Sequence, residues 1–391
     1  MRIIVETGSR REMNKKKVLI LHGQPGMGHL ITAKALMEVF SQKYPEIEIK
    51  DADAFDFCSK IFKHGYPYLY NHIVLRAPVL FKILYNSHKS KLVYKFLKKL
   101  TEFFINKKKF ISFIKDFSPN FIIATNPLPL QMVSIIEEKR IIDIESANVC
   151  TDYGFHPVWY SPDINHYFVA TEEIKKSLFD HGVDSDKIKI TGIPVRPLFN
   201  QPLDRQEILQ SLNFNFHQPV LLIVGGQLKY KELLKVVLGI KVKNSLAQFI
   251  VIAGRDKTLQ KKLENSQLKK ISTVRIFGLV SDMERFMTAS DVILSKAGGS
   301  TTAECLVKGL PMIVYKTIPG QEEDNVNYLV NNNAGIKVKS IREIIDAVVG
   351  LFSQPNKLAK MKKNCLKIQK PNASEDIADF VVSQIKNLFK T

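Results

Sequence analysis

Ser295-Lys-Ala-Gly-Gly-Ser-Thr-Thr-Ala-Glu304 directly follows the apolar run Asp291-Val-Ile-Leu-Ser295. The apolar run predicts a short buried strand, and the glycine turn Gly298-Gly299 predicts the start of a helix at Ser300. A helix start directs unpaired backbone N–H groups and the positive end of the helix dipole at one point, which suits a phosphate. The stretch therefore predicts a strand–turn–helix unit of an α/β sheet with an anion site at its turn.

A second polar loop follows the next predicted strand, Met312-Ile-Val-Tyr315. This loop ends in Gly320-Gln-Glu-Glu-Asp-Asn325, which supplies carboxylates and amides. In a parallel sheet the carboxyl ends of the strands share one edge, so we expect this loop to lie beside the glycine turn. Glu304, in the first turns of the helix, is placed to accept hydrogen bonds from a sugar hydroxyl. Together the two loops indicate a pocket for a nucleoside diphosphate.

The rest of the chain repeats this alternation of buried strands and helices in two halves. The first half opens with the strand Lys17-Val-Leu-Ile-Leu-His22, and the second with Pro219-Val-Leu-Leu-Ile-Val-Gly-Gly226. Such alternation predicts parallel sheets with crossover helices. A length of 391 residues suits two domains of roughly 150–200 residues, each with its own core.

The region from Ser295 to Asn325 resembles the nucleotide-sugar half of the family-28 glycosyltransferases, which adopt the two-domain GT-B fold. Its loop Ile318-Pro-Gly-Gln-Glu-Glu-Asp-Asn325 resembles the branch that glycosylates diacylglycerol, the monogalactosyl- and glucosyl-diacylglycerol synthases. Thr191-Gly-Ile-Pro-Val-Arg-Pro197 resembles the interdomain linker of that branch. The resemblance implies two Rossmann-like doubly wound domains facing a cleft. It divides the chain into an acceptor- and membrane-binding domain (1–195), a nucleotide-sugar-binding domain (196–374) and a helix that crosses back to the first domain (375–391).

The first glycine loop, Leu21-His-Gly-Gln-Pro-Gly-Met-Gly-His-Leu30, admits three interpretations. A P-loop needs lysine and Ser/Thr where His29 and Leu30 stand, and a dinucleotide fingerprint needs a third glycine where Ile31 stands. The loop instead resembles the Gly-x-Gly-His element of the family-28 enzymes. In that interpretation Gly28 lets the backbone approach the acceptor, and His29 is the base that deprotonates the attacking hydroxyl. The alternative is that His29 only caps its helix.

A second polar segment, Cys150-Thr-Asp-Tyr-Gly-Phe-His-Pro-Val-Trp-Tyr160, resembles the Thr-Asp-x-x-x-His-x-x-Trp element of the same branch. The resemblance implies that Asp152 orients or tunes His29, or holds the acceptor hydroxyl. It places His156 and Trp159 at the acceptor, and we expect Asn126, after another strand, at the same edge. The alternative is that the aromatic residues belong to the core and that Asp152 is a helix cap.

The donor residues that these motifs predict lie in the second half and follow its predicted strands. Arg255 is equally compatible with a surface position. The predicted nucleotide-sugar residues are Gly226, Arg255, Phe277, Lys296, Gly298, Gly299, Ser300, Thr301, Glu304, Gln321, Glu322, Glu323 and Asn325.

No cofactor or metal is expected, because GT-B enzymes as a class need none; the UDP-sugar is a substrate. The charge of the leaving group would fall on the Ser300 helix start and on Lys296 or Arg255. Asp51-Ala-Asp53 matches the Asp-x-Asp metal pattern of other glycosyltransferases, but it follows the predicted strand Ile47–Lys50 of the first domain. We therefore interpret it as accidental.

The formal net charge of +19 indicates attraction to a polyanion. Between Lys82 and Lys115 lysines surround an apolar stripe, with Glu102 as the single acid, which is typical of an interfacial helix on anionic lipid. The alternative is an ordinary amphipathic helix packed on its own domain. Nucleic acid is not expected, since this block holds no arginine and no binding motif is present.

The chain contains no apolar run of 18 residues and no signal-peptide pattern, so we expect no membrane span. Its four cysteines have no paired spacing, which fits a reducing cytoplasm. We therefore expect a peripheral protein on the inner face of the cell membrane.

These features predict an inverting transferase that moves glucose or galactose from a UDP-sugar to diacylglycerol. One alternative is a peptidoglycan-type N-acetylglucosaminyltransferase with a lipid-pyrophosphate acceptor. A nucleotide-sugar epimerase would share the fold without needing a basic amphipathic helix. A non-enzymatic lipid-binding protein would give His29, Glu304 and the glycine loops no purpose. Neither the donor sugar nor the number of sugars added follows from the motifs.

Overall fold

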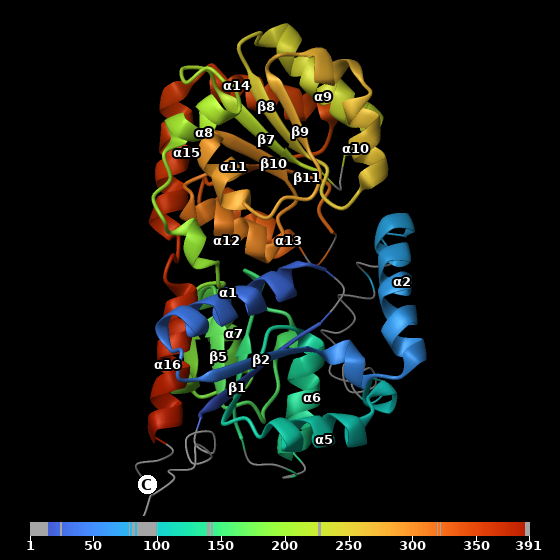
Figure 1. Ribbon diagram of the computed structural model, residues 1–391, viewed down its shortest axis with the longest axis vertical. Coiled ribbons are helices and arrows are strands. Elements are labelled where there is room, and N and C mark those ends of the chain that lie inside the picture. The colour runs from blue at the N-terminus through green and yellow to red at the C-terminus, as the bar shows by residue number, and fades with distance from the viewer. Residues whose placement is uncertain are drawn as a thin grey trace, which may run out of the picture. The chain divides into compact units, whose positions relative to one another are not determined.

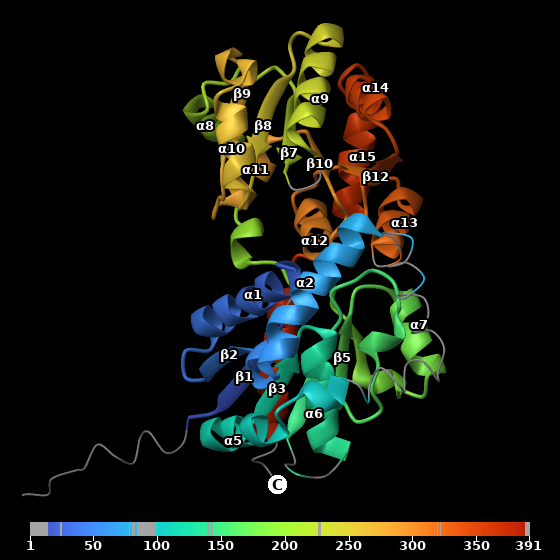
Figure 2. The same cartoon turned by 90° about the vertical axis from the view of Figure 1, so that its right-hand side faces the viewer.

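The computed structural model of the protein divides into two compact units, residues 1–197 with 372–391 and residues 198–371 (Figures 1 and 2). The structure describes residues 15–23, 26–77, 79, 83, 99, 101–138, 141, 144–225, 228–318, 320 and 322–387.

The described residues of the first unit form a six-stranded parallel sheet with the order β2-β1-β3-β4-β5-β6. Its strands are β1 (Lys17–His22), β2 (Glu48–Asp53), β3 (Phe121–Ala124), β4 (Glu145–Val149), β5 (His166–Val169) and β6 (Ile188–Ile190). Its helices are α1 (Gly28–Lys43), α2 (Lys60–Arg76), α5 (Lys107–Phe117), α6 (Pro127–Glu138), α7 (Glu172–Asp180) and α16 (Ala373–Asn387). The chain passes from β1 to the edge strand β2 and returns to β3 on the other side of β1. This reversal places a topological switch point at the carboxyl ends of β1 and β3, where open α/β sheets bind ligands.

The predicted strand Lys17–His22 is confirmed, and both of its faces are covered. Val18 and Ile20 belong to one core cluster, whereas Leu19 and Leu21 point to the opposite face and are also fully buried. A strand that is buried on both faces reads as a continuous apolar run, which is why this one was recognisable.

The predicted strand Ile47–Lys50 is too short, because β2 pairs with β1 up to the His22–Asp53 position. Asp51 and Asp53 therefore lie within the strand rather than after it. The Asp51 carboxylate accepts a hydrogen bond from His22 Nε2 at 3.1 Å, and Asp53 accepts one from the Phe55 backbone N–H at 2.9 Å. Both carboxylates thus have local structural partners.

Helix α16, near the end of the chain, is part of the first unit and packs on α1. Its buried side chains join the core cluster that α1 forms on one face of the sheet; they are Ile377, Ala378, Val381, Val382 and Ile385. Asp379 accepts hydrogen bonds from Lys43 at 2.8 Å and from the Tyr44 hydroxyl at 2.7 Å. These bonds fix α16 against the last turn of α1.

The described residues of the second unit form another six-stranded parallel sheet, with the order β12-β11-β10-β7-β8-β9. Its strands are β7 (Val220–Val224), β8 (Gln248–Ile252), β9 (Val274–Phe277), β10 (Val292–Ser295), β11 (Met312–Tyr315) and β12 (Gly335–Val338). Its helices are α8 (Arg205–Ser211), α9 (Tyr230–Lys243), α10 (Lys257–Glu264), α11 (Met283–Ala289), α12 (Gly299–Val307), α13 (Glu323–Asn331), α14 (Ile341–Phe352) and α15 (Pro355–Ile368). The order reverses between β7 and β10, so the second switch point lies where β10 enters the turn before α12.

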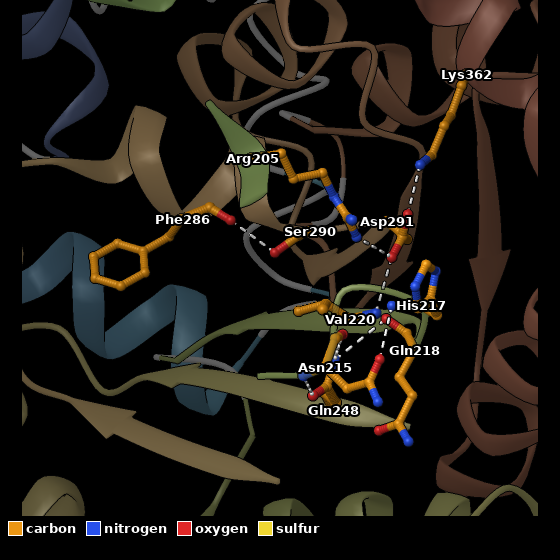
Figure 3. Close-up of polar contacts among 10 residues, drawn as sticks. All are labelled: Arg205, Asn215, His217, Gln218, Val220, Gln248, Phe286, Ser290, Asp291 and Lys362. Carbon is orange, nitrogen blue, oxygen red and sulfur yellow. Dashed lines mark hydrogen bonds and ion pairs between the residues drawn. The ribbon is translucent and has the colours of Figure 1, made fainter. Parts of the chain in front are cut away.

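A polar network holds the amino ends of this second sheet, opposite its carboxyl edge (Figure 3). Asp291 Oδ2 accepts hydrogen bonds from Arg205 of α8 and from the Val220 backbone N–H, both at 2.9 Å, and Oδ1 accepts one from Lys362 of α15 at 2.7 Å. One largely buried carboxylate thereby joins β7 and β10 to two helices.

Half of the basic block Lys82–Lys115 lies outside the described residues. Its described C-terminal part is α5, whose Phe110, Ile114 and Phe117 are buried in the first unit. For this part the apolar stripe packs on its own domain, as the alternative interpretation predicted. No helix among the described residues is both long and apolar enough to cross a membrane.

Candidate active site

His29 lies at the switch point of the first sheet, in the first turn of α1. Its Nδ1 is 2.8 Å from the backbone carbonyl of Thr125, the residue that follows β3. Thr125 in turn is tied to β1, because its backbone N–H donates to the Leu21 carbonyl at 2.9 Å. The ends of β1 and β3 thus fix the histidine ring.

The hydroxyl oxygen of Thr151, two residues after the end of β4, lies 3.1 Å from the same nitrogen of His29. A carbonyl oxygen only accepts hydrogen bonds, so the Thr125 contact requires the proton of neutral His29 to be on Nδ1. Nε2 then carries the lone pair. Burial lowers the pKa of His29 to about 4, the Thr125 carbonyl raises it and neighbouring His22 lowers it. His29 is therefore neutral near pH 7, the state that a general base needs.

Trp159 packs beside His29, with ring centroids 6.0 Å apart. The indole is 2% exposed, and its Nε1 donates to Asp152 Oδ2 at 3.0 Å. Asn148 of β4 donates to the Trp159 carbonyl at 3.1 Å. Asp152 thus holds the indole that lies against the histidine, and Trp159 is a buried support of the site.

Two of the other acceptor residues predicted from the sequence, Asn126 and His156, serve as local caps. Asn126, 6% exposed, accepts a hydrogen bond from the Leu128 backbone at 2.9 Å in the first turn of α6. His156, 3% exposed, accepts one from Val158 at 3.3 Å in a short 3₁₀ turn. Gly28 is the first residue of α1.

The first unit thus brings His29, Asp152, Trp159 and Asn126 to one edge of the sheet. Sequence reasoning missed Thr125 and Thr151, whose oxygen atoms contact the histidine. Thr125 directly follows β3 and Thr151 lies two residues after β4, at the same edge of the sheet as the His29 loop. The rule that polar residues after buried strands gather at one edge, which predicted Asn126, would also have identified these two threonines.

In the second unit α12 begins at Gly299 with Gly298 as its N-cap, one residue before the predicted start at Ser300. Gly299, Ser300 and Glu304 are buried in its first turns, and Thr301 is half-buried. The hydroxyl of Thr302 is buried without a hydrogen-bond partner in the described structure. A helix start presents backbone N–H groups that have no acceptor within the helix, together with the positive end of the helix dipole, and this combination suits a diphosphate.

The loop after β11 is tied to this helix start by two contacts. Glu322, 4% exposed, accepts a hydrogen bond from the Ile318 backbone at 3.0 Å and lies 3.3 Å from Lys296 Nζ. Asn325, fully buried, donates to the Ala297 carbonyl at 2.9 Å. The loop after β11 therefore lies beside the glycine turn before α12, as predicted. Glu323 opens α13 and is half-buried, and Gln321 lies outside the described residues.

The remaining donor residues follow β7, β8 and β9. Gly226 lies outside the described residues, but a Cβ on the preceding Gly225 would stand 2.7 Å from the Ile252 carbonyl, so glycine is required there. Arg255 is exposed, after a glycine with a φ of +64°. Phe277 packs on Phe286, with ring centroids 4.7 Å apart. Within the described residues, no group of three His, Cys, Asp or Glu side chains is arranged to hold a metal ion.

Two protein-family models match the two halves of the chain. The model of monogalactosyldiacylglycerol (MGDG) synthase matches residues 29–195, and that of the glycosyltransferase family 28 C-terminal domain matches residues 220–379. Monogalactosyldiacylglycerol synthase 3 of Arabidopsis thaliana is 30% identical over 383 residues, which cover 93% of this chain and 80% of that protein. The chain belongs to the diacylglycerol-glycosylating branch of the family-28 glycosyltransferases.

This family-28 glycosyltransferase is also similar to the processive diacylglycerol beta-glucosyltransferase of Bacillus subtilis (strain 168), with 27% identity over 379 residues, 94% of this chain and 95% of that protein. Among solved structures it resembles the UDP-GlcNAc 2-epimerase of Neisseria meningitidis bound to UDP-GlcNAc, with a TM-score of 0.60, 16% identity, and coverage of 94% of this chain and 100% of that one. It also resembles Acinetobacter baumannii MurG, with a TM-score of 0.57, 14% identity, and coverage of 95% and 100%.

At sequence identities this low, the similarity to these solved structures shows the fold alone. The predicted GT-B fold class, with two Rossmann-like parallel-sheet domains, is confirmed. The family model of the first half begins at His29, and that of the second half includes the whole β10–α12 and β11–α13 region.

Proposed function

We propose that this family-28 glycosyltransferase moves glucose or galactose from a UDP-sugar to diacylglycerol with inversion, giving a β-glycosyldiacylglycerol. The proposal is supported by the relatives, one named a beta-glucosyltransferase of diacylglycerol and the other a monogalactosyldiacylglycerol synthase. These relatives do not favour the peptidoglycan-type alternative. The observation that carries the chemistry is the His29 ring, whose hydrogen-bond contacts among the described residues are both made at Nδ1.

On the acceptor side, Nε2 of neutral His29 accepts the proton of the diacylglycerol hydroxyl as its oxygen attacks the anomeric carbon. The new carbon–oxygen bond forms on the face opposite the diphosphate, the bond to UDP breaks, and UDP leaves with the electron pair. The configuration at that carbon is thereby inverted. The burial that keeps His29 neutral also makes it a weak base, so its proton affinity must rise as the negative charge on UDP develops.

On the donor side, the start of α12 binds the diphosphate through its backbone N–H groups, and Lys296 adds a positive charge. Glu304, Gln321, and Glu322 or Glu323 bind hydroxyl groups of the ribose or the transferred sugar. Leaving-group charge is then stabilised by the protein alone, so we propose that the reaction needs no metal ion. Activity that survives excess EDTA would support this, and activity restored only by an added divalent cation would contradict it.

We further propose that the enzyme works as a peripheral protein on the inner face of the cell membrane, where its acceptor lies. The support is the net charge of +19 and a set of exposed apolar side chains in the first unit. On α2, Ile61 is 80% exposed, and Tyr68 and Leu69 are also exposed. Phe103, in the described remainder of the basic block, is 82% exposed.

The experiment that tests the reaction offers radiolabelled UDP-glucose and UDP-galactose, in parallel, to the protein with diacylglycerol in mixed vesicles. We expect label in a chloroform-soluble product with one of the two donors, which identifies the reaction class and the sugar together. Label that stays in the aqueous phase with both donors would contradict the proposed function and favour the alternative of a nucleotide-sugar epimerase.

A further inference from the structure

The His29 ring is held at one nitrogen by two oxygen atoms from different strand ends. The Thr125 carbonyl after β3 is 2.8 Å from Nδ1, and the Thr151 hydroxyl oxygen after β4 is 3.1 Å from it. Within the described structure, these are the hydrogen-bond contacts of the ring. Thr151 is 5% exposed, so no bulk water competes for this position.

The two oxygen atoms play different parts. The carbonyl decides where the proton resides, since it accepts only and therefore places the hydrogen on Nδ1. With that hydrogen in place, the Thr151 oxygen also acts as an acceptor, and the two share one N–H. A single acceptor still allows the ring to turn about its Cβ–Cγ bond and so to leave the Thr125 carbonyl, whereas a second acceptor defines the plane of the ring and thereby keeps the hydrogen on Nδ1.

The supports of Thr151 are rigid. The preceding residue, Cys150, donates its backbone N–H to the Phe168 carbonyl of β5 at 2.9 Å, which continues the sheet up to the threonine. The following residue, Asp152, holds the Trp159 indole against the histidine. Thr151 therefore stands between two fixed groups and has little freedom to leave its contact with His29.

We propose that Thr151 is a positioning residue, which holds the imidazole of His29 in the plane and the Nδ1–H tautomer that aim Nε2 at the acceptor hydroxyl. This inference rests on the proposed role of His29 as the base. A lone pair must point along the line of proton transfer, so a ring that turns or changes tautomer loses productive encounters even when the substrate is bound. Thr151 thus influences turnover and leaves the affinity for the UDP-sugar unchanged.

The test compares Thr151→Val, which keeps the shape and removes the oxygen, with Thr151→Ser, which keeps the oxygen. Long-range proton–nitrogen NMR of the full-length protein with ¹⁵N-labelled histidine reports the tautomer of His29, assigned by the loss of its signals in His29→Gln. We expect the Nδ1–H pattern in the wild type and in Thr151→Ser, and a mixture of tautomers in Thr151→Val. In the lipid-transfer assay we expect kcat to fall about tenfold in Thr151→Val, with the KM for the UDP-sugar within a factor of two.

Thr171→Val is the matched control for lost stability. Thr171 is buried two residues after the neighbouring strand β5, where its hydroxyl accepts a hydrogen bond from the Ile174 backbone N–H at 3.3 Å. This variant should lose stability and keep both the tautomer and kcat. A Thr151→Val protein that retains the pure Nδ1–H pattern would overturn the proposal, whatever its kcat. The NMR measurement does not depend on enzymatic activity. A wild-type protein that transfers no sugar to lipid would refute the proposed function, and the NMR spectra would still show whether Thr151 holds the His29 ring.

Discussion

The ammonium group of Lys296 lies 3.3 Å from the carboxylate of Glu322, a side chain that is only 5% exposed. Lys296 follows β10 and Glu322 precedes α13, so this ion pair joins the turn that leads into α12 to the loop after β11. The carboxylate also accepts a hydrogen bond from the Ile318 backbone. Glu322 is therefore fixed, whereas Lys296, which is half-exposed, has room to turn toward a diphosphate.

Lys296→Ala should weaken the binding of UDP about tenfold, because one charge-assisted contact to phosphate is lost, on the order of 1.4 kcal/mol. Isothermal titration with UDP measures this directly. Lys269→Ala, which removes an exposed lysine near the amino end of β9, controls for the general loss of positive charge. Equal weakening in the two variants would show that Lys296 acts only through the net charge.

His29→Ala should lower turnover by roughly 10²–10⁴-fold, the usual contribution of a general base, while UDP binding is largely kept. The measurements are single-turnover transfer to diacylglycerol and UDP titration. UDP bound as tightly as by the wild type, together with retained turnover, would make His29 structural. A loss of UDP binding would place it at the donor instead.

The pKa of His29, lowered to about 4 by burial, also predicts how stability depends on pH. In the unfolded chain the pKa of a histidine is about 6.5, so the unfolded state takes up a proton first as the pH falls. The contribution of His29 to stability is thus fully present above pH 6.5 and is lost between about pH 6.5 and 4. Thermal unfolding across this range should show a steeper fall for the wild type than for His29→Gln. Parallel curves would contradict the lowered pKa.

The hydrogen bonds of the Asp291 carboxylate lead us to expect a large loss of stability when it is removed, at the edge of the sheet opposite the candidate donor site. Asp291→Ala leaves Arg205, Lys362 and the Val220 N–H without their acceptor, and we expect a loss of about 2–3 kcal/mol in the stability of the second unit. Asp346→Ala removes the exposed partner of Lys243 and should cost far less stability, because solvent screens an exposed ion pair. Urea denaturation followed by a probe in the second unit compares them, and equal midpoints would show that the network in Figure 3 is not a stabilising element.

The parts of the fold that could be predicted from the sequence are those where local pattern and packing agree. The runs Lys17–His22 and Val220–Val224 are buried on both faces and flanked by turns, so their strands were evident. The Gly298–Gly299 turn predicted the start of α12 to within one residue, because the helix begins at Gly299 and was expected at Ser300. The end of β2 was missed because Asp51 and Asp53 are poor strand formers that pairing with β1 holds in the sheet.

The candidate site was only partly predictable, because its contacts join residues that are distant in the sequence. His29 was identified from its glycine loop, but its contact with Thr151 spans 122 residues. Asp152 was expected to act on His29, and the structure shows it bonded to Trp159, which lies against that ring. The Trp159 bond depends on how the loop after β4 folds back, which no local pattern in the sequence records.

Membrane association provides the last prediction, since diacylglycerol is reached only at a bilayer. Sedimentation with vesicles should increase with the fraction of anionic lipid and decrease with salt, because a net charge of +19 is screened by added ions. Ile61→Glu places a charge on an exposed apolar position of α2 and should reduce binding several-fold. Val242→Glu, at an 87% exposed position of α9 in the second unit, is the matched control and should change little. Equal sedimentation with neutral and anionic vesicles would exclude an electrostatic contribution to membrane binding. An equal loss in the two variants would show that α2 does not face the lipid, and that the added negative charge alone weakens binding.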